Sequence, residues 1–172
     1  FDEYLQNIEA DRCLRRDDLV DALDRRAPFS VMATDFDFGA DACSGLRPRG
    51  NLYRYRGATG MCIKPRRGMV YEHGPGFDTA FEKLCLEIAK GEWALYSVDD
   101  VADGLVVVLS GEAAAPATLR VSLEDGSQAQ TLAVSGAFAA LKTDRIAAQG
   151  PVRIRVECVQ GAVDLHALRF EA

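Results

Sequence analysis

The last part of the chain alternates apolar and charged side chains so regularly that it limits the fold more than any other feature. Residues 151–157 read Pro-Val-Arg-Ile-Arg-Val-Glu, in which apolar and charged side chains alternate strictly after Pro151, and a second candidate strand follows at 162–170. Successive side chains of a β-strand point to opposite faces, so the first run must bury one face and leave the other in water. Gln160 and Gly161 stand between the runs, and we predict that they turn the chain into a hairpin that closes the domain.

Turn-forming residues recur through the rest of the chain after Val31, at intervals of about 8 to 12 residues, with short apolar runs between them. This spacing is typical of a sandwich or barrel built from many short strands. We predict strands at residues 30–36, 92–98, 104–110, 117–123, 128–134, 151–158 and 162–170. Residues 77–88 fit both a helical stripe and an alternating strand, and periodicity alone does not decide between them.

The beginning of the chain has a different pattern. Apolar residues at 1, 4, 5 and 8 have the spacing of one helical face, and a second polar–apolar run at 17–23 is followed by Pro28. We therefore predict two short helices there. A chain of 172 residues has the size of one domain with an appendage. We expect a helical lead at 1–29 and an all-β sandwich at 30–172.

Charge and composition exclude several classes of protein. The chain has 20 Lys and Arg against 26 Asp and Glu, a net charge of -6, so a nucleic-acid backbone would meet a repulsive field. No apolar run approaches the roughly 20 residues of a spanning helix, and no signal peptide is present. We predict neither a nucleic-acid nor a membrane partner. Because the chain starts at Phe1 rather than at a methionine, we expect it to be processed or cut from a longer protein.

Residues that carry catalysis or bind metals are sparse. The five cysteines include no Cys-x-x-Cys pair, which argues against a zinc or redox motif but leaves disulfide pairing open. Phosphate loops, nucleophile elbows and His-Glu-x-x-His motifs do not occur. Asp35 and Asp37 lie closer together than the catalytic carboxylates of glycoside hydrolases, and Asp164 with His166 is more simply a polar pair on one strand face. We predict that the chain has no catalytic residues and is not an enzyme.

Aromatic residues in the predicted loops suggest a binding function. A flat ring can stack on the apolar face of a sugar while neighbouring polar groups bind the hydroxyls. The candidates for this role are Tyr53, Tyr55, Tyr71, Phe77 and Phe138. Trp93 lies inside an alternating strand, and we expect it in the core. A cluster of arginines interleaved with Tyr53 and Tyr55 would also suit a single nucleic-acid strand, but pairing with nearby acids is the favoured interpretation. Its members are Arg47, Arg49, Arg54, Arg56, Arg66 and Arg67.

Five segments, in order, resemble carbohydrate-binding module family 6 and its relative family 35. Residues 32–39 are similar to the family's opening strand, E-A-E-D-[FY]-D, and residues 51–56 resemble N-x-x-Y-R. Residues 91–98 are similar to G-[DE]-W-x-x-Y-x-V, 135–138 to T-G-x-W, and 161–170 to the terminal G-G-x-N-L-D-W-[IL]-R-F. The resemblance covers roughly residues 30–171. It implies a jelly-roll β-sandwich and favours a strand at 83–89.

The resemblance also implies a function. The family is non-catalytic, is usually attached to a glycoside hydrolase, and holds that enzyme against a polysaccharide. We therefore expect a secreted accessory module whose partners are a polysaccharide or oligosaccharide and a linked or associated catalytic domain. In the family two aromatics clamp a sugar and an asparagine binds a hydroxyl. By position these residues are Tyr55, with Tyr53 as second choice, Phe138, and Asp164, whose carboxylate accepts hydrogen bonds but cannot donate them.

The family's structural calcium site is altered in this sequence. Its ligands are two acidic residues of the first strand and an aspartate of the last, and these positions are Met32, Thr34 and His166 here. Calcium prefers oxygen ligands, several of them carboxylates, so we predict no metal and no cofactor. The alternative to sugar binding is a structural or interaction sandwich that has lost its ligand and packs against a catalytic domain or partner chain. A large apolar surface that includes Phe1 would favour this alternative.

Overall fold

Nine antiparallel strands make up most of the described part of the chain. The computed structural model describes residues 23–39, 41–45, 59–70 and 83–172. One short 3₁₀ turn, η1 (Ala33–Asp35), follows the first strand. The strands are β1 (Phe29–Met32), β2 (Cys43–Ser44), β3 (Cys62–Pro65), β4 (Leu84–Ala89), β5 (Trp93–Val101), β6 (Val106–Leu123), β7 (Gln130–Lys142), β8 (Gly150–Gln160) and β9 (Ala162–Glu171).

The predicted all-β sandwich is confirmed, and the described part of the ambiguous segment forms strand β4, as the family resemblance implied, whereas residues 77–82 lie outside the described residues. The helical lead falls mostly on residues 1–22, which lie outside the described residues. In the part that the structure describes, no helix is long and apolar enough to cross a membrane.

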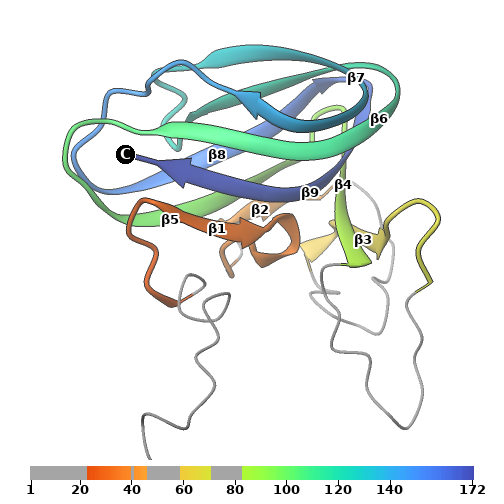
Figure 1. Ribbon diagram of the computed structural model, residues 1–172, viewed down its shortest axis with the longest axis horizontal. Helices are drawn as coiled ribbons and strands as arrows, with labels where there is room; N and C mark the ends of the chain where they lie inside the picture. The colour runs from red at the N-terminus through yellow and green to blue at the C-terminus, as the bar shows by residue number, and fades with distance from the viewer. Residues whose placement is uncertain (1–22, 40, 46–58, 71–82) are drawn as a thin grey trace, which may run out of the picture.

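Strand β6 joins the two layers of the sandwich. The strand order is β2-β5-β8-β6-β9-β4-β3, with β1 added to β9 and β7 added to β6. The first half of β6 pairs with β9 and its second half with β8, while β7 follows it on the other side (Figure 1). The register shifts between Ala113 and Ala117, where a bulge bends the strand from one layer into the other. The chain continues through this bulge as one strand, β6, where the sequence predicted two strands, at 104–110 and 117–123.

The predicted closing hairpin is wrong, because β8 and β9 do not pair with each other. They flank β6 from its two halves and so belong to different layers. Gly161 has a φ of 78°, and a Cβ there would lie 2.8 Å from the Cβ of Ala117. Only glycine allows the chain to pass so closely over the bend of β6.

The core lies between the layers and takes every second side chain of the long strands. Tyr96 is fully buried, and its hydroxyl donates a hydrogen bond of 2.8 Å to the carbonyl of Ala33. The rings of Phe29 and Phe170 stack with centroids 4.8 Å apart, which fixes β1 against β9. The four cysteines within the described residues, Cys43, Cys62, Cys85 and Cys158, are free and buried, as small apolar residues are.

Candidate functional site

Three carboxylates stand side by side on the outer surface of one layer. Asp164 of β9 lies directly opposite Glu87 of β4 on one side and Glu112 of β6 on the other. Val163 and Leu165 are buried in the core, so Asp164 points outward. The side chains of Glu87, Asp164 and Glu112 are 17%, 21% and 16% exposed. We call these three residues the acidic row.

Two cations partly neutralise the acidic row. The Lys64 ammonium of β3 lies 2.5 Å from Glu87 Oε2 and 2.9 Å from Asp164 Oδ1. Arg67 Nε lies 3.7 Å from Glu112 Oε2. Burial lowers the pKa of Lys64, but its hydrogen bonds to the two carboxylates and their charges raise it further, so its pKa lies above the ordinary value. The lysine is therefore charged at neutral pH and holds two neighbouring strands together.

His166 lies beside the acidic row but adds no charge to it. Its Nε2 is buried and has no hydrogen-bond partner among the described residues. Burial and the positive charge of Arg66 lower the pKa of His166, although Glu112 and Asp164 act in the opposite direction. The imidazole is thus neutral at pH 7. On the neighbouring strand, burial and the charge of Asp164 raise the pKa of the Cys85 thiol to about 12, so it is not a nucleophile.

The register of β6 and β7 separates two of the predicted sugar-binding residues. Phe138 stands opposite Gly111, which in turn stands opposite the buried Leu165. The half-buried Phe138 ring packs against the core, and its Cζ would lie only 3.0 Å from a Cβ on Gly111. Asp164 points to the outer face, so the two side chains lie on opposite faces of the sheet. Tyr53 and Tyr55 fall outside the described residues, and the sugar-binding role of all four residues stays a prediction.

Trp93 lies on the surface of the other layer, and the expectation that it belongs to the core is wrong. Its neighbours on β5, Ala94 and Tyr96, occupy the core instead. The half-buried indole packs under Arg155, whose Cζ is 4.4 Å from the ring centroid. The sequence indicated this placement, because Trp93 and the polar Ser97 are four residues apart and therefore lie on the same face of the strand.

Glu157 binds the cations around this tryptophan. It lies 3.2 Å from Arg155 Nη2 and 2.8 Å from Arg120 Nη2. The Trp93 face is therefore made of stacked and ion-paired groups, although the buried Nε of Arg155 has no hydrogen-bond partner among the described residues.

Asp37 connects three parts of the described chain through its hydrogen bonds. Its carboxylate accepts hydrogen bonds from Arg25 at 2.7 Å, from the Ser97 hydroxyl at 2.7 Å and from Arg153 at 3.3 Å. It thereby ties the start of the described chain to β5 and β8.

The positions of the family's calcium ligands do not fit a metal. Thr34 is buried, and Met32 stands opposite Ala167, the residue after His166. A thioether and an imidazole are poor calcium ligands. Within the described ranges, no group of three or more His, Cys, Asp or Glu residues could hold a metal ion.

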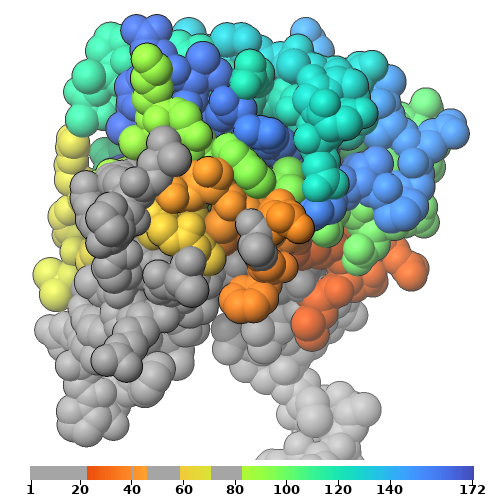
Figure 2. All heavy atoms as spheres, turned by 180° about the vertical axis from the view of Figure 1, so that it is seen from behind, coloured from red at the N-terminus to blue at the C-terminus, as the bar shows by residue number. Residues whose placement is uncertain are grey.

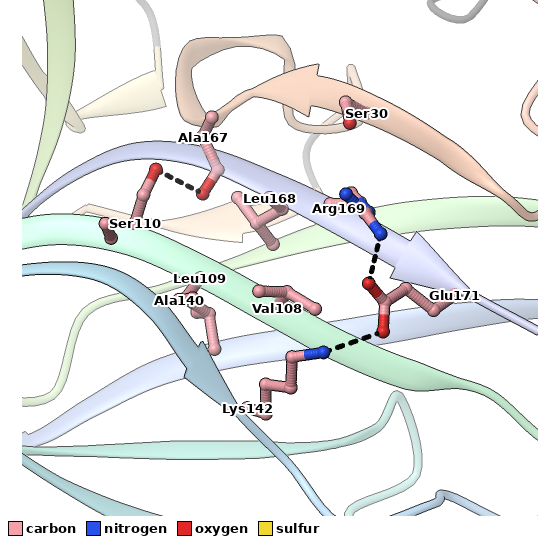
Figure 3. A pocket seen from close by; sticks show the side chains of 11 residues that line it. Ser30, Val108, Leu109, Ser110, Ala140, Lys142, Ala167, Leu168, Arg169 and Glu171 are labelled. Carbon is pink, nitrogen blue, oxygen red and sulfur yellow. Dashed lines mark hydrogen bonds and ion pairs between the residues drawn. The ribbon is translucent and has the colours of Figure 1, made fainter.

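A shallow cavity of about 260 Å³ lies over β6, β7 and β9 (Figure 3). At one end, Glu171 accepts hydrogen bonds from both Lys142 and Arg169, which lower the pKa of this carboxyl. Its floor consists mostly of small residues such as Ser110 and Ala140. The charged side chains at this end of the cavity therefore pair with one another.

Comparison with known proteins identifies the fold. No family model matches the sequence, and no curated protein sequence matches it. The structure of CsCBM6-3 from Clostridium stercorarium in complex with cellobiose matches 86% of this chain and 95% of that chain, with 16% identity and a TM-score of 0.57. The module CBM6cm-2 from Cellvibrio mixtus lichenase 5A in complex with cellotriose matches 84% and 97%, with 12% identity and a TM-score of 0.57.

A larger enzyme contains a similar fold. The GH115 4-O-methyl-alpha-glucuronidase BtGH115A matches 87% of this chain but 18% of its own, with 14% identity and a TM-score of 0.50. At such identities the comparisons show the fold, and they confirm the resemblance to carbohydrate-binding module family 6.

Proposed function

We propose that this chain is a non-catalytic carbohydrate-binding module that serves a polysaccharide-processing glycoside hydrolase outside the cell. The fold is shared with modules whose structures hold cellobiose and cellotriose. A fold alone does not specify a ligand, so the proposal rests on the chemistry of the site. The acidic row with Lys64 is the observation that carries it.

The Lys64–Asp164 pair offers an acceptor and a donor next to each other. Lys64 contacts Oδ1 of Asp164, and none of the described residues donates a hydrogen bond to Oδ2. An ammonium has three donors, of which Glu87 and Asp164 use two. Oδ2 can accept a hydrogen bond from one sugar hydroxyl while the third ammonium proton is donated to a neighbouring hydroxyl. Charge-assisted bonds of this kind are about twice as strong as neutral ones.

The burial of the acidic row makes this site rigid. Each of its side chains is largely covered, and Lys64 fixes two of them in place. A ligand therefore loses little free energy to the ordering of these side chains when it binds. The residue that replaces the family's asparagine stands at the centre of the row, which supports Asp164 as the hydroxyl-binding residue.

Stacking on aromatic rings is the second part of the proposal. Tyr55, with Tyr53 as second choice, precedes the strand that carries Lys64 by a few residues. Phe138 completes the proposed set, but it is the least suited of them, because its ring packs against the core.

Affinity electrophoresis against soluble β-glucans, xylans and galactans tests the proposal. We expect retardation of the folded chain in at least one polysaccharide gel, reversed by the matching free oligosaccharide. A folded protein that migrates freely in all of them would contradict sugar binding.

A structural or interaction domain that packs against a catalytic domain or partner chain is the second candidate. Two observations favour it: Lys64 already neutralises Asp164, and Phe138 packs inward. This candidate predicts that the chain co-purifies with its catalytic domain when the two are expressed as separate polypeptides, and that it binds no polysaccharide in the same assay.

A further inference from the structure

Asp164 faces a carboxylate on each neighbouring strand, but only one of these two pairs shares a cation. Glu87 of β4 lies directly opposite it, and the Lys64 ammonium joins the two, 2.5 Å from Glu87 Oε2 and 2.9 Å from Asp164 Oδ1. Figure 2 shows β4, in yellow-green, beside the blue end of the chain at the molecular surface. Glu112 of β6 also lies directly opposite Asp164, and no cation of the described chain joins this second pair. Directly opposite residues have Cβ atoms about 4.5–5.5 Å apart, so the two pairs have similar spacing.

Glu112 is a largely covered carboxylate that accepts no hydrogen bond. Its side chain is 16% exposed, and within the described ranges its one ion-pair partner is Arg67, with Nε 3.7 Å from Glu112 Oε2. The Arg67 side chain is itself 70% exposed, and an exposed partner of this kind contributes little and is easily displaced. Covered polar groups normally have hydrogen-bond partners, so Glu112 points to a ligand that supplies a donor.

The other basic residues beside the acidic row do not neutralise this pair. Arg66 donates a hydrogen bond from Nε to the Leu84 carbonyl, and His166 is neutral at pH 7. Neither forms an ion pair with Asp164 or Glu112. Like charges directly opposite each other destabilise a sheet, so a positive charge between these two carboxylates would be favourable.

We propose that the sugar ligand of this site carries an amino group, whose ammonium lies between Asp164 and Glu112. This position repeats that of the Lys64 ammonium between Asp164 and Glu87. The inference rests on the proposed function, sugar binding, and names the class of ligand: a polysaccharide of amino sugars, such as a chain of β-linked glucosamine units.

A glucosamine unit matches the donors and acceptors of the site. Its ammonium and a hydroxyl stand on neighbouring carbons of the ring. The ammonium donates hydrogen bonds to Oδ2 of Asp164 and to Glu112, while the hydroxyl accepts the third proton of the Lys64 ammonium. A lysine side chain of a partner protein would supply the ammonium without this neighbouring hydroxyl, so the amino sugar uses more of the site.

The charge of the whole chain also favours a cationic ligand. A net charge of -6 attracts a polysaccharide whose units are positively charged and repels one whose units carry carboxylates. The replacement of the family's asparagine by Asp164 acts in the same direction, because it adds a negative charge where the sugar is proposed to bind.

Isothermal titration of the whole chain with three oligosaccharides tests the proposal at about pH 6, where carboxyl groups are ionised and amines are charged. A glucosamine tetramer and cellotetraose share a backbone and differ by an ammonium or a hydroxyl at one carbon of each unit. The tetramer of N-acetylglucosamine has an uncharged amide there. We expect the glucosamine tetramer to bind at least about tenfold more tightly than either of the others.

Two matched variants locate the ammonium. Glu112→Gln keeps the size of the side chain and removes its charge, so the ratio of affinities for the glucosamine tetramer and cellotetraose should fall to less than about threefold. Glu157→Gln should leave this ratio unchanged, because that carboxylate is 13% exposed but lies on the Trp93 face. Thermal unfolding followed by circular dichroism verifies that both variants fold.

The possible failures are distinguishable. Equal affinity for the glucosamine tetramer and cellotetraose overturns the amino sugar and leaves sugar binding in place, whereas no binding of any tetramer contradicts the proposed function as well. A ratio that Glu112→Gln does not change overturns the position of the ammonium. If Nα-acetyl-lysine amide displaces the glucosamine tetramer at a similar concentration, the amino sugar is overturned in favour of a lysine from a partner protein.

Discussion

Two largely buried aspartates, one in each layer, differ in the number of hydrogen-bond donors that surround their carboxylates. Asp37 is 12% exposed, and its two oxygens accept hydrogen bonds from Arg25, Arg153 and Ser97. Donors outnumber carboxylates around it. The acceptor capacity of such a carboxylate is used within the protein, and its hydrogen bonds stabilise the fold.

Asp164 is 21% exposed and shares one lysine with Glu87, while Glu112 stands on its other side. Carboxylates outnumber the cations within hydrogen-bond distance here. Asp164 therefore keeps acceptor capacity that a ligand can use. The difference shows that the balance between donors and acceptors, rather than burial, separates a structural carboxylate from a candidate binding one.

The largest expected loss of stability follows from replacement of Asp37. Asp37→Ala leaves Arg25 and Arg153 partly buried without their shared partner, so we expect a loss of about 3–5 kcal/mol in the free energy of unfolding. Urea denaturation followed by circular dichroism measures it. A loss below about 1 kcal/mol would mean that Asp37 is no more structural than a surface acid.

Removal of the lysine from the acidic row is expected to have a smaller effect. Lys64→Met leaves Glu87 and Asp164 as like charges directly opposite each other, and we expect a loss of about 1–2 kcal/mol at pH 7. The second substitution Glu87→Gln removes the repulsion and should restore most of the loss. If the double variant is as unstable as Lys64→Met, the lysine acts through packing instead of charge.

The same lysine gives a pH dependence. Its pKa in the folded protein is raised above the ordinary value of 10.5, so its contribution to stability is complete below pH 10.5 and is lost as the pH rises further. We expect wild-type stability to fall more steeply than that of Lys64→Met in urea titrations above pH 10. Parallel curves for the two proteins would contradict the ion pairs.

Replacement of Asp164 should change stability least among the acids compared here. Asp164→Asn keeps the shape of the side chain, and Lys64 retains Glu87, so the free energy of unfolding should change by less than about 1 kcal/mol. Urea denaturation beside Asp37→Ala gives the direct contrast. A loss as large as that of Asp37→Ala would make Asp164 a structural residue and remove the basis for a ligand site.

The smallest expected effect is at His166. Its pKa in the folded protein is lowered from 6.5, mainly by burial, so the unfolded chain binds its proton more readily and stability is lost as the pH falls below 6.5. His166→Gln should flatten this part of the stability profile between about pH 6.5 and pH 5. An unchanged profile would show that the imidazole is already solvated.

The alternation of apolar and charged residues predicted which face of a strand is buried, but it did not predict which strands lie next to each other. The alternation at 151–157 correctly placed Ile154 and Val156 in the core. It could not show that β6 separates β8 from β9, since the Gln160–Gly161 turn fits a hairpin equally well. Strand order depends on contacts far apart in the sequence, and a periodicity of two residues contains no information about them.

The candidate site shows the same limit. The family resemblance led to Asp164, which the structure places in the acidic row, but Lys64 comes from a strand distant in the sequence and was not predicted. Phe138 is nearby along the sheet, yet the register turns its ring to the other face. A one-residue difference in register decides such a placement, and sequence pattern does not fix it.

Isothermal titration with the oligosaccharide selected by electrophoresis tests the central claim most directly. Asp164→Ala should weaken binding about ten- to a hundredfold, the value of one lost hydrogen bond to a charged group. Glu157→Ala is the matched control, because this carboxylate is also half-buried and paired but lies on the Trp93 face. Unchanged affinity for Glu157→Ala with loss for Asp164→Ala is the predicted result. Loss for Glu157→Ala with wild-type affinity for Asp164→Ala would contradict it and move the site to the other layer.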